Sequence, residues 1–376
     1  MIEPFRFEAP QAALDDLHER LDRARWPERE TVDDWSQGVP LDAMKALVEH
    51  WRHRYDWRAC EAKINALPNF TSEIDGLPIH FIHVRSAHQD ALPIILTHGW
   101  PGSILEFLDV IDPLTNPEKH GGSAQDAFHV VIPSLPGYGF SGKPADTGWG
   151  VERIANAWAI LMQRLGYGRY VAQGGDWGSA VTRMMAAQRP EGLEAIHLNM
   201  VIVFPNAGED NSDAEAQEAI AVANAHKRWG LGYSTQQSTR PQTLAYALAD
   251  SPIGQAAWIY EKLQAWTDND GRAEDALPAE AILDLITLYW LTNTGGSSAR
   301  LYWESFSTAF GDSPIELPVA CSIFPAEMRR PPRRWAERVF SNIIHWNRLE
   351  KGGHFAAFEQ PSLFVSELRN AFRKIR

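Results

Sequence analysis

The chain has 376 residues, of which 44% are hydrophobic, so it is long enough to bury a large core. Its formal net charge of −13 argues against nucleic-acid binding, which needs a basic surface. The two cysteines, Cys60 and Cys321, form no C-x-x-C pair, so neither a zinc site nor a disulfide framework is expected.

The N-terminal region predicts helices and turns. Residues 1–11 show no basic region followed by an apolar stretch, and the chain has no run of about 18 apolar residues. We therefore expect a cytoplasmic protein that does not associate with a membrane. Apolar residues at helical spacing predict helices over 10–26 and 41–57.

Strands and helices alternate from about residue 70 to residue 201. Because the strands are nearly continuous apolar runs, we expect a mostly parallel sheet that helices cover on both faces. The eight expected strands are 70–74, 79–85, 92–99, 128–134, 170–174, 195–201, 317–325 and 343–349. The expected helices are 103–114, 150–165, 178–188 and 361–373.

Residues 206–314 interrupt this alternation. The stretch is polar, helical in character and rich in aromatic residues, and strand-type sequence flanks it on both sides. We expect a helical lid here; a separate helical domain without a catalytic role is the alternative. The predicted organisation is a leader segment at 1–70, a first core part at 71–205, the lid at 206–314 and a second core part at 315–376.

The stretch "VAQGGDWGSA", residues 171–180, places Asp176 between the end of a strand and the start of a helix. Hydrolases of the α/β class hold a nucleophile at the centre of such a sharp turn, where small neighbours let the strand and the helix approach each other. The N-terminus of the helix favours a negative charge. A simple N-cap is the alternative, but the flanking glycines favour a nucleophile.

Three other candidate site segments follow strands, and ligands of open α/β sheets bind at the carboxyl ends of strands. "LTHGWPGS", 96–103, resembles the loop that supplies one oxyanion N–H, so the backbone amides of Trp100 and Trp177 are the candidate donors. His354 in "GGHFAAFEQP" is the candidate base, and Glu327 in "FPAE" is the carboxylate that would orient it. The alternatives are an ordinary loop, a structural histidine and a solvated glutamate.

Two other patterns carry no site. "GYGFSG", 137–142, fits G-x-G-x-x-G, but Lys143 and Pro144 follow instead of a helix, and Met162 stands where a dinucleotide site needs an acidic residue. His80 and His83 have H-x-x-H spacing, but in a strand they would point to opposite faces. We expect neither a cofactor nor a metal.

An aspartate nucleophile indicates a particular chemistry. A carboxylate needs no activating base at pH 7, and it is suited to displacing a leaving group from a saturated carbon. The product would be an alkyl ester of Asp176, which water activated by His354 would hydrolyse, while the oxyanion hole stabilises the tetrahedral intermediate. Epoxides and alkyl halides are the two substrate classes that fit.

The sequence resembles the epoxide hydrolases of the microsomal and juvenile-hormone type over nearly its whole length. "RWPE", "GVPLD" and "HWRHRYDWR" resemble that family's leader segment, and "HGWPGS", "GGDWGS" and "GGHFAAFEQP" match its catalytic motifs. The resemblance implies an α/β-hydrolase core with a lid, and Glu327 as the acid. "LGYSTQQSTRPQT" and "SSARLYW" resemble the lid stretches that hold the family's two ring-opening tyrosines, which implies Tyr233 and Tyr302. Two phenols can polarise an epoxide oxygen and donate a proton.

We therefore expect an enzyme that opens an epoxide to a vicinal diol through a covalent intermediate, in detoxification or secondary metabolism. The expected partners are a small apolar or aryl epoxide and water, without nucleic acid or membrane; a homodimer is left open. A haloalkane dehalogenase is the alternative enzyme, although that class often has Asn after His-Gly, where this chain has Trp100. A non-catalytic binding protein on a hydrolase scaffold is the alternative outside enzymes.

Overall fold

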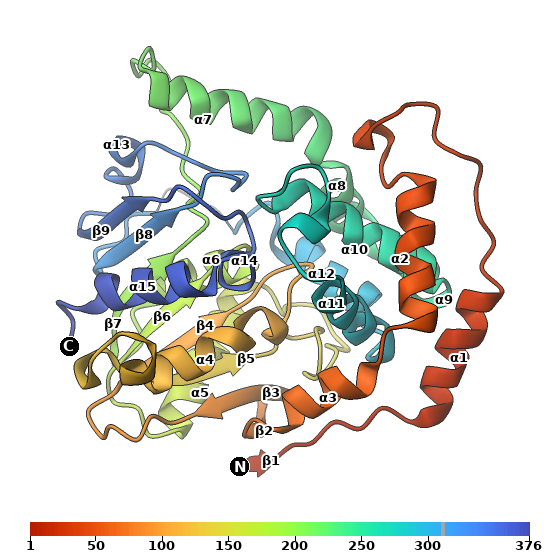
Figure 1. Ribbon diagram of the computed structural model, residues 1–376. Helices are drawn as coiled ribbons and strands as arrows, with labels where there is room; N and C mark the ends of the chain where they lie inside the picture. The colour runs from red at the N-terminus through yellow and green to blue at the C-terminus, as the bar shows by residue number, and fades with distance from the viewer. Residues whose placement is uncertain (310–312) are drawn as a thin grey trace.

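A nine-stranded sheet forms the centre of the molecule (Figure 1). The computed structural model describes residues 1–309 and 313–376. The strands, in their order across the sheet, are β1 (Ile2–Pro4), β2 (Asn69–Ile74), β3 (Leu77–Val84), β5 (Phe128–Pro133), β4 (Leu92–Thr97), β6 (Tyr170–Gly174), β7 (Leu193–Leu198), β8 (Val319–Ile323) and β9 (Ile343–Arg348). The pairs from β5 to β9 are parallel, and β1, β2 and β3 are antiparallel to their neighbours. The expected mostly parallel sheet is confirmed.

The sheet has nine strands where the sequence predicted eight. The additional strand is β1, in which Ile2 pairs with Ser72 of β2. Three residues are too few to show the alternation that identifies a strand in a sequence. The extra strand extends the antiparallel edge and leaves the parallel part, where the candidate site lies, as expected.

Helices cover both faces of the sheet and connect its strands. The long helices are α1 (Gln11–Asp22), α2 (Leu41–His53), α3 (Trp57–Asn65), α4 (Leu108–Thr115), α5 (Val151–Arg164), α6 (Trp177–Gln188), α7 (Ala214–Ala225), α8 (Gly232–Thr239), α9 (Pro241–Asp250), α10 (Pro252–Trp266), α11 (Ala279–Leu291), α12 (Gly295–Ser305) and α15 (Pro361–Phe372). Two short helices are α13 (Arg333–Ala336) and α14 (Ala356–Glu359).

Two hydrophobic clusters lie on opposite faces of the central strands. Side chains of α5 and α6 belong to one cluster, and side chains of α4 and α15 belong to the other. Because successive strand residues point to opposite faces, neighbours in the sequence enter different clusters. Such neighbours are Ile94 and Ile95 of β4, Val130 and Val131 of β5, and Val171 and Ala172 of β6. Burial on both faces explains why these strands are continuous apolar runs.

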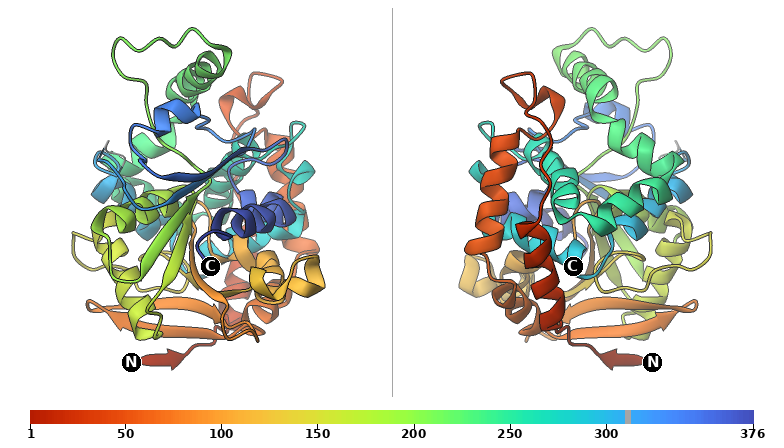
Figure 2. Two further views of the ribbon diagram at one scale, coloured as in Figure 1. Left: turned by 90° about the vertical axis from the view of Figure 1, so that its left-hand side faces the viewer. Right: turned by 90° about the vertical axis from the view of Figure 1, so that its right-hand side faces the viewer.

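Between β7 and β8, the described residues of the chain form the helices α7 to α12 and no named strand. In this segment α12 packs against α8 and α9. The first two long helices of the chain, α1 and α2, lie beside these helices (Figure 2). Buried Trp51 of α2 donates from Nε1 to Oγ1 of Thr287 in α11, at 2.9 Å. The N-terminal segment therefore contacts both the sheet edge and the helices between β7 and β8.

No helix in the described part of the chain combines the length and the apolar character that crossing a membrane requires.

Candidate active site

Asp176 stands at a sharp turn between β6 and α6. Its backbone has φ +49° and ψ −126°, a conformation that non-glycine residues rarely adopt. Two glycines make this turn sterically possible. A Cβ on Gly178 would lie 1.9 Å from the carbonyl oxygen of Thr97, and one on Gly174 would lie 2.0 Å from that of Gly178. The strand and the helix therefore approach so closely that only hydrogen fits at these two positions.

The carboxylate of Asp176 does not cap its own helix. Its side chain makes no capping hydrogen bond to α6. Oδ1 instead accepts a hydrogen bond of 2.7 Å from the backbone N–H of Trp100, in the loop that follows β4. Trp177, the second predicted oxyanion donor, is the first residue of α6. The N–H groups of a helix's first turn have no acceptor within the helix and point outward along its axis.

His354 lies between two carboxylates. Its Nε2 is 3.5 Å from Oδ2 of Asp176, and its Nδ1 is 3.0 Å from Oε2 of Glu327. The Glu327 side chain is fully buried, and its Oε1 accepts from the backbone N–H of Met328 at 2.6 Å. Burial opposes the charged imidazolium, but Glu327 and Asp176 outweigh it and raise the pKa of His354 well above its ordinary value. The structure thus brings the predicted nucleophile, base and acid into one contiguous row.

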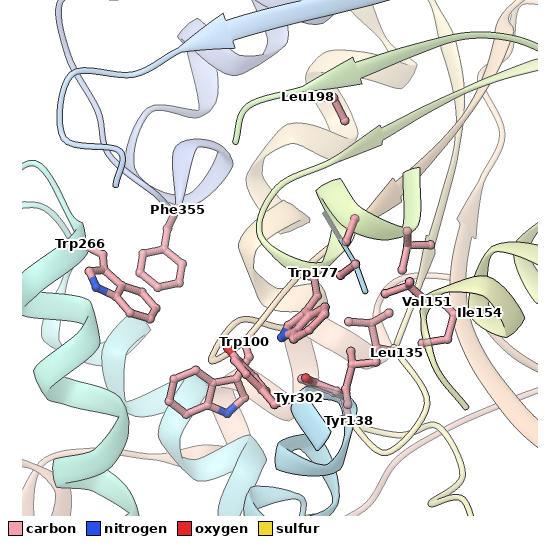
Figure 3. Close-up of a cluster of buried hydrophobic side chains, with 14 of the residues drawn as sticks. Trp100, Leu135, Tyr138, Val151, Ile154, Trp177, Leu198, Trp266, Tyr302 and Phe355 are labelled. Atoms are coloured by element: carbon pink, nitrogen blue, oxygen red, sulfur yellow. The ribbon is translucent and has the colours of Figure 1, made fainter. Parts of the chain in front are cut away.

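The two tyrosines implied by the resemblance also meet here, on α8 and α12. The rings of Tyr233 and Tyr302 are 5.7 Å apart, and each packs against the indole of Trp100. Figure 3 shows Tyr302 together with Trp100 and Trp177. The hydroxyl of Tyr302 is buried. Burial raises the pKa of both phenols, which keeps them protonated.

Two cavities meet at Asp176. The larger, about 310 Å³, lies between the sheet and the helices of the 206–314 segment, and Tyr233 and Tyr302 line it. Its other walls are mostly apolar, and they include Met200, Ile202, Phe204, Leu231, Phe306 and Met328. The smaller cavity, about 20 Å³, has room for roughly one water molecule.

The small cavity is lined by polar groups that the sequence reasoning did not single out. They are Glu106, Gln173 and Asn199, beside Asp176 and His354. Oε1 of Gln173 is buried without a hydrogen-bond partner in the described part of the chain. Burial raises the pKa of Glu106 to about 8. In the sequence, Ser103 and Glu106 form a capping-box pattern, and Ser103 N–H does donate to Glu106 at 3.1 Å, so a second role for Glu106 had no signal of its own.

The two rejected patterns have structural roles. Residues 137–142 form a turn that Gly137 N–H closes by donating to the carbonyl of Gly142 at 2.8 Å, and the next helix begins only at Val151. His80 contacts Ser134 and Asn69, while His83 contacts Tyr167. Within residues 1–309 and 313–376, no group of three or more His, Cys, Asp and Glu side chains is placed to hold a metal ion.

The class of α/β hydrolases is defined by a parallel sheet with a nucleophile, here Asp176, at the strand-to-helix turn. A carboxylate and then a histidine follow it in the chain, as Glu327 and His354 do here. Residues 93–224 match the family model described as "alpha/beta hydrolase fold", and residues 2–107 match "Epoxide hydrolase N terminus".

Comparison with known proteins identifies the family. A protein of Stigmatella aurantiaca (strain DW4/3-1) named "Putative epoxide hydrolase" is 58% identical over 376 residues, which cover 100% of this chain and 86% of that protein. "Epoxide hydrolase 1" of Sus scrofa is 33% identical over 98% of this chain and 88% of its own length. The structure of Aspergillus niger epoxide hydrolase superposes with a TM-score of 0.91 at 34% identity and covers 100% of this chain and 97% of that one. The chain therefore belongs to the epoxide hydrolase family.

Proposed function

We propose that this protein hydrolyses an epoxide to a vicinal diol through an alkyl ester on Asp176. The observation that carries the proposal is the position of the Asp176 carboxylate. One of its oxygens faces the Trp100 amide at 2.7 Å, and the other faces His354 at 3.5 Å. The same carboxylate also lines a largely apolar cavity with two tyrosines. A small apolar or aryl epoxide fits these walls, and residues 206–314 would act as the lid over it.

In the first step, Tyr233 and Tyr302 bind the epoxide oxygen while an oxygen of Asp176 attacks a ring carbon. The new carbon–oxygen bond forms as the ring carbon–oxygen bond breaks, and a phenol gives its proton to the developing alkoxide. Phenols whose pKa burial has raised are protonated at neutral pH, so they enter the step as donors. The products of this step are a hydroxyalkyl ester of Asp176 and one phenolate.

In the second step, His354 removes a proton from water, which adds to the ester carbonyl of Asp176. The amides of Trp100 and Trp177 stabilise the tetrahedral oxyanion. When the intermediate collapses, His354 returns its proton to the departing oxygen of the diol. The remaining proton of the water leaves Asp176 as the carboxylate re-forms and restores the phenol, so that one epoxide and one water give one diol.

The charge of Asp176 controls when His354 acts as the base. In the free enzyme both Asp176 and Glu327 hold the proton on His354, because they raise its pKa. Ester formation removes the negative charge of Asp176, and the pKa of His354 then falls. His354 then releases its extra proton to solvent and takes one up again when the Asp176 carboxylate re-forms. The base therefore becomes available after alkylation, for the hydrolysis step that needs it. The small polar cavity beside His354 and Asp176 supplies a place for the water.

The test is a paired assay on the purified protein. We expect diol from styrene oxide and no halide from 1-chlorohexane or 1,2-dibromoethane. Halide release without diol would favour the haloalkane dehalogenase alternative and remove the tyrosines from the mechanism. Asp176→Ala is the matched control, and it should abolish diol formation while the protein stays folded. If the wild type forms neither product, the Asp176 mechanism stays in place and a narrower, specialised epoxide is indicated.

A further inference from the structure

Arg329 is a permanent cation in the wall of the large cavity. It follows Glu327 by two residues in the loop after β8, and it lines the same cavity as Asp176, Tyr233 and Tyr302. An arginine side chain stays protonated at every physiological pH. Its presence is unexpected because the wall around it is mostly apolar. Burial partly withdraws the guanidinium from solvent, which lowers the pKa of Arg329.

Arg329 forms no ion pair with a carboxylate among the described residues, unlike its arginine neighbours, although the charge of Glu327 acts on it. Among the residues that the structure describes, it makes no hydrogen bond or ion pair, and its guanidinium carbon lies 5.7 Å from the ring of Phe204. The following arginines are all paired with acids: Arg330 with Glu218, Arg333 with Glu337, Arg334 with Asp213, Arg338 with Glu209, and Arg348 with Glu215. Five of the six arginines in this segment are therefore paired with acids. The remaining one, Arg329, lines the large cavity.

We propose that Arg329 binds a carboxylate on the substrate, so that the preferred epoxides carry an acid group at the end of an apolar chain or ring. This inference rests on the function proposed above. A partly desolvated cation gains most from an anion that enters the same cavity. The planar guanidinium matches a carboxylate with two parallel N–H donors. The guanidinium lies beside Phe204, which is 47% exposed, and lines the cavity together with the two tyrosines.

The geometry also sets the shape of such a substrate. The epoxide has to lie between Asp176 and the two tyrosines, while the carboxylate reaches the guanidinium of Arg329 in the same cavity. Met200, Ile202, Leu231, Phe306 and Met328 would cover the apolar part between them. The separation between epoxide and acid therefore has an optimum. If the carboxylate is attached directly to the epoxide ring, the separation is too short for it to reach Arg329. If the chain between them is long, the carboxylate lies beyond Arg329.

The experiment compares kcat/KM for terminal epoxides that end in a carboxylate with kcat/KM for their methyl esters, across a series from epoxybutanoate to epoxydecanoate. At the best chain length we expect the wild type to favour the acid about tenfold or more, as a charge-assisted pair would give. In Arg329→Met the acid-to-ester ratio should fall to about one or below. Because the ratio is taken within one variant, a general loss of activity cancels.

Arg330→Met is the matched control, since it removes the adjacent arginine, which is paired with Glu218. It should keep the wild-type ratio, and Arg329→Lys should keep part of it. Equal use of acid and ester by the wild type at every length would overturn the inference, as would a preference that survives Arg329→Met. Diol from the esters without an acid preference contradicts this inference alone. No diol from any member of the series contradicts the proposed function, and the inference falls with it.

Discussion

Nδ1 of His354 lies 3.0 Å from Oε2 of Glu327, and both side chains are almost completely buried. A buried carboxylate this close to the imidazole fixes its orientation and favours its charged form. Ester hydrolysis requires His354 to become an imidazolium when it takes a proton from water. The pair therefore belongs to the second step of the proposed mechanism and not to the first.

Glu327→Gln should slow turnover about 100-fold or more while alkylation continues, because the amide keeps the shape of the side chain but loses its charge. Stopped-flow fluorescence and rapid-quench mass analysis separate the two steps. Glu337→Gln changes an exposed glutamate and is the control. An equal loss in both steps would argue that Glu327 is needed only for folding.

The pKa of His354 should fall when Asp176 loses its charge. Asp176 and Glu327 both raise this pKa, so Asp176→Asn leaves one counter-charge instead of two. In the wild type, histidine ring NMR should place the midpoint of His354 above 6.5, and in Asp176→Asn the midpoint should move down. The resonance is assigned by its loss in His354→Gln. A midpoint that does not move would contradict the proposed coupling between ester formation and base activation.

The same coupling fixes the sign of the pH dependence. The esterified enzyme lacks the Asp176 charge, so its His354 loses a proton at lower pH than in the free enzyme. The acid limb of kcat, when hydrolysis limits turnover, should therefore lie below the His354 midpoint of the free enzyme. An acid limb at or above that midpoint would mean that esterification does not lower the pKa of His354.

Tyr233→Phe and Tyr302→Phe should each slow alkylation by about 10- to 100-fold, and the double variant should slow it further, because a remaining phenol can still donate the proton. The decay of a preformed ester should not change. Tyr246, which lies in the same helical segment and is 71% exposed, provides the control Tyr246→Phe. Alkylation at the wild-type rate in the double variant would remove both phenols from the mechanism.

Glu106→Gln tests the small cavity beside His354. Glutamine can still accept the hydrogen bond from Ser103 N–H, so the local turn is retained. The amide that replaces the carboxyl group should position the attacking water less well, so that ester decay slows about tenfold. Alkylation, which uses the other cavity, should be unaffected. Unchanged ester decay would show that Glu106 serves only as the cap of its turn.

The elements of the core are predictable because their signals are local. Apolar runs located β4 and β5, and the glycines around Asp176 marked the turn before α6. The expected helix over 41–57 ends at His53 instead, and Asp56 caps a separate helix, α3, that was not predicted, with its side chain accepting from Arg58 N–H. The strand β1 was missed because it is only three residues long.

Residues that act through the tertiary structure left weaker signals. Tyr233 and Tyr302 were chosen from nine tyrosines by family resemblance alone, since nothing local distinguishes them. Arg329 lies in a segment with several arginines, and only the positions of the surrounding acids show that it lacks a partner. The contact of Trp51 with Thr287 spans 236 positions, which no periodic pattern records.

The proposed mechanism requires Asp176 to form a covalent ester that His354 helps to hydrolyse. The most direct measurement is the intact mass of His354→Gln after brief incubation with styrene oxide, followed by peptide mapping. We predict an increase by the mass of one epoxide molecule, located on Asp176 and lost in the double variant Asp176→Asn/His354→Gln. No adduct in His354→Gln while the wild type still forms diol, or an adduct on another residue, would contradict this mechanism.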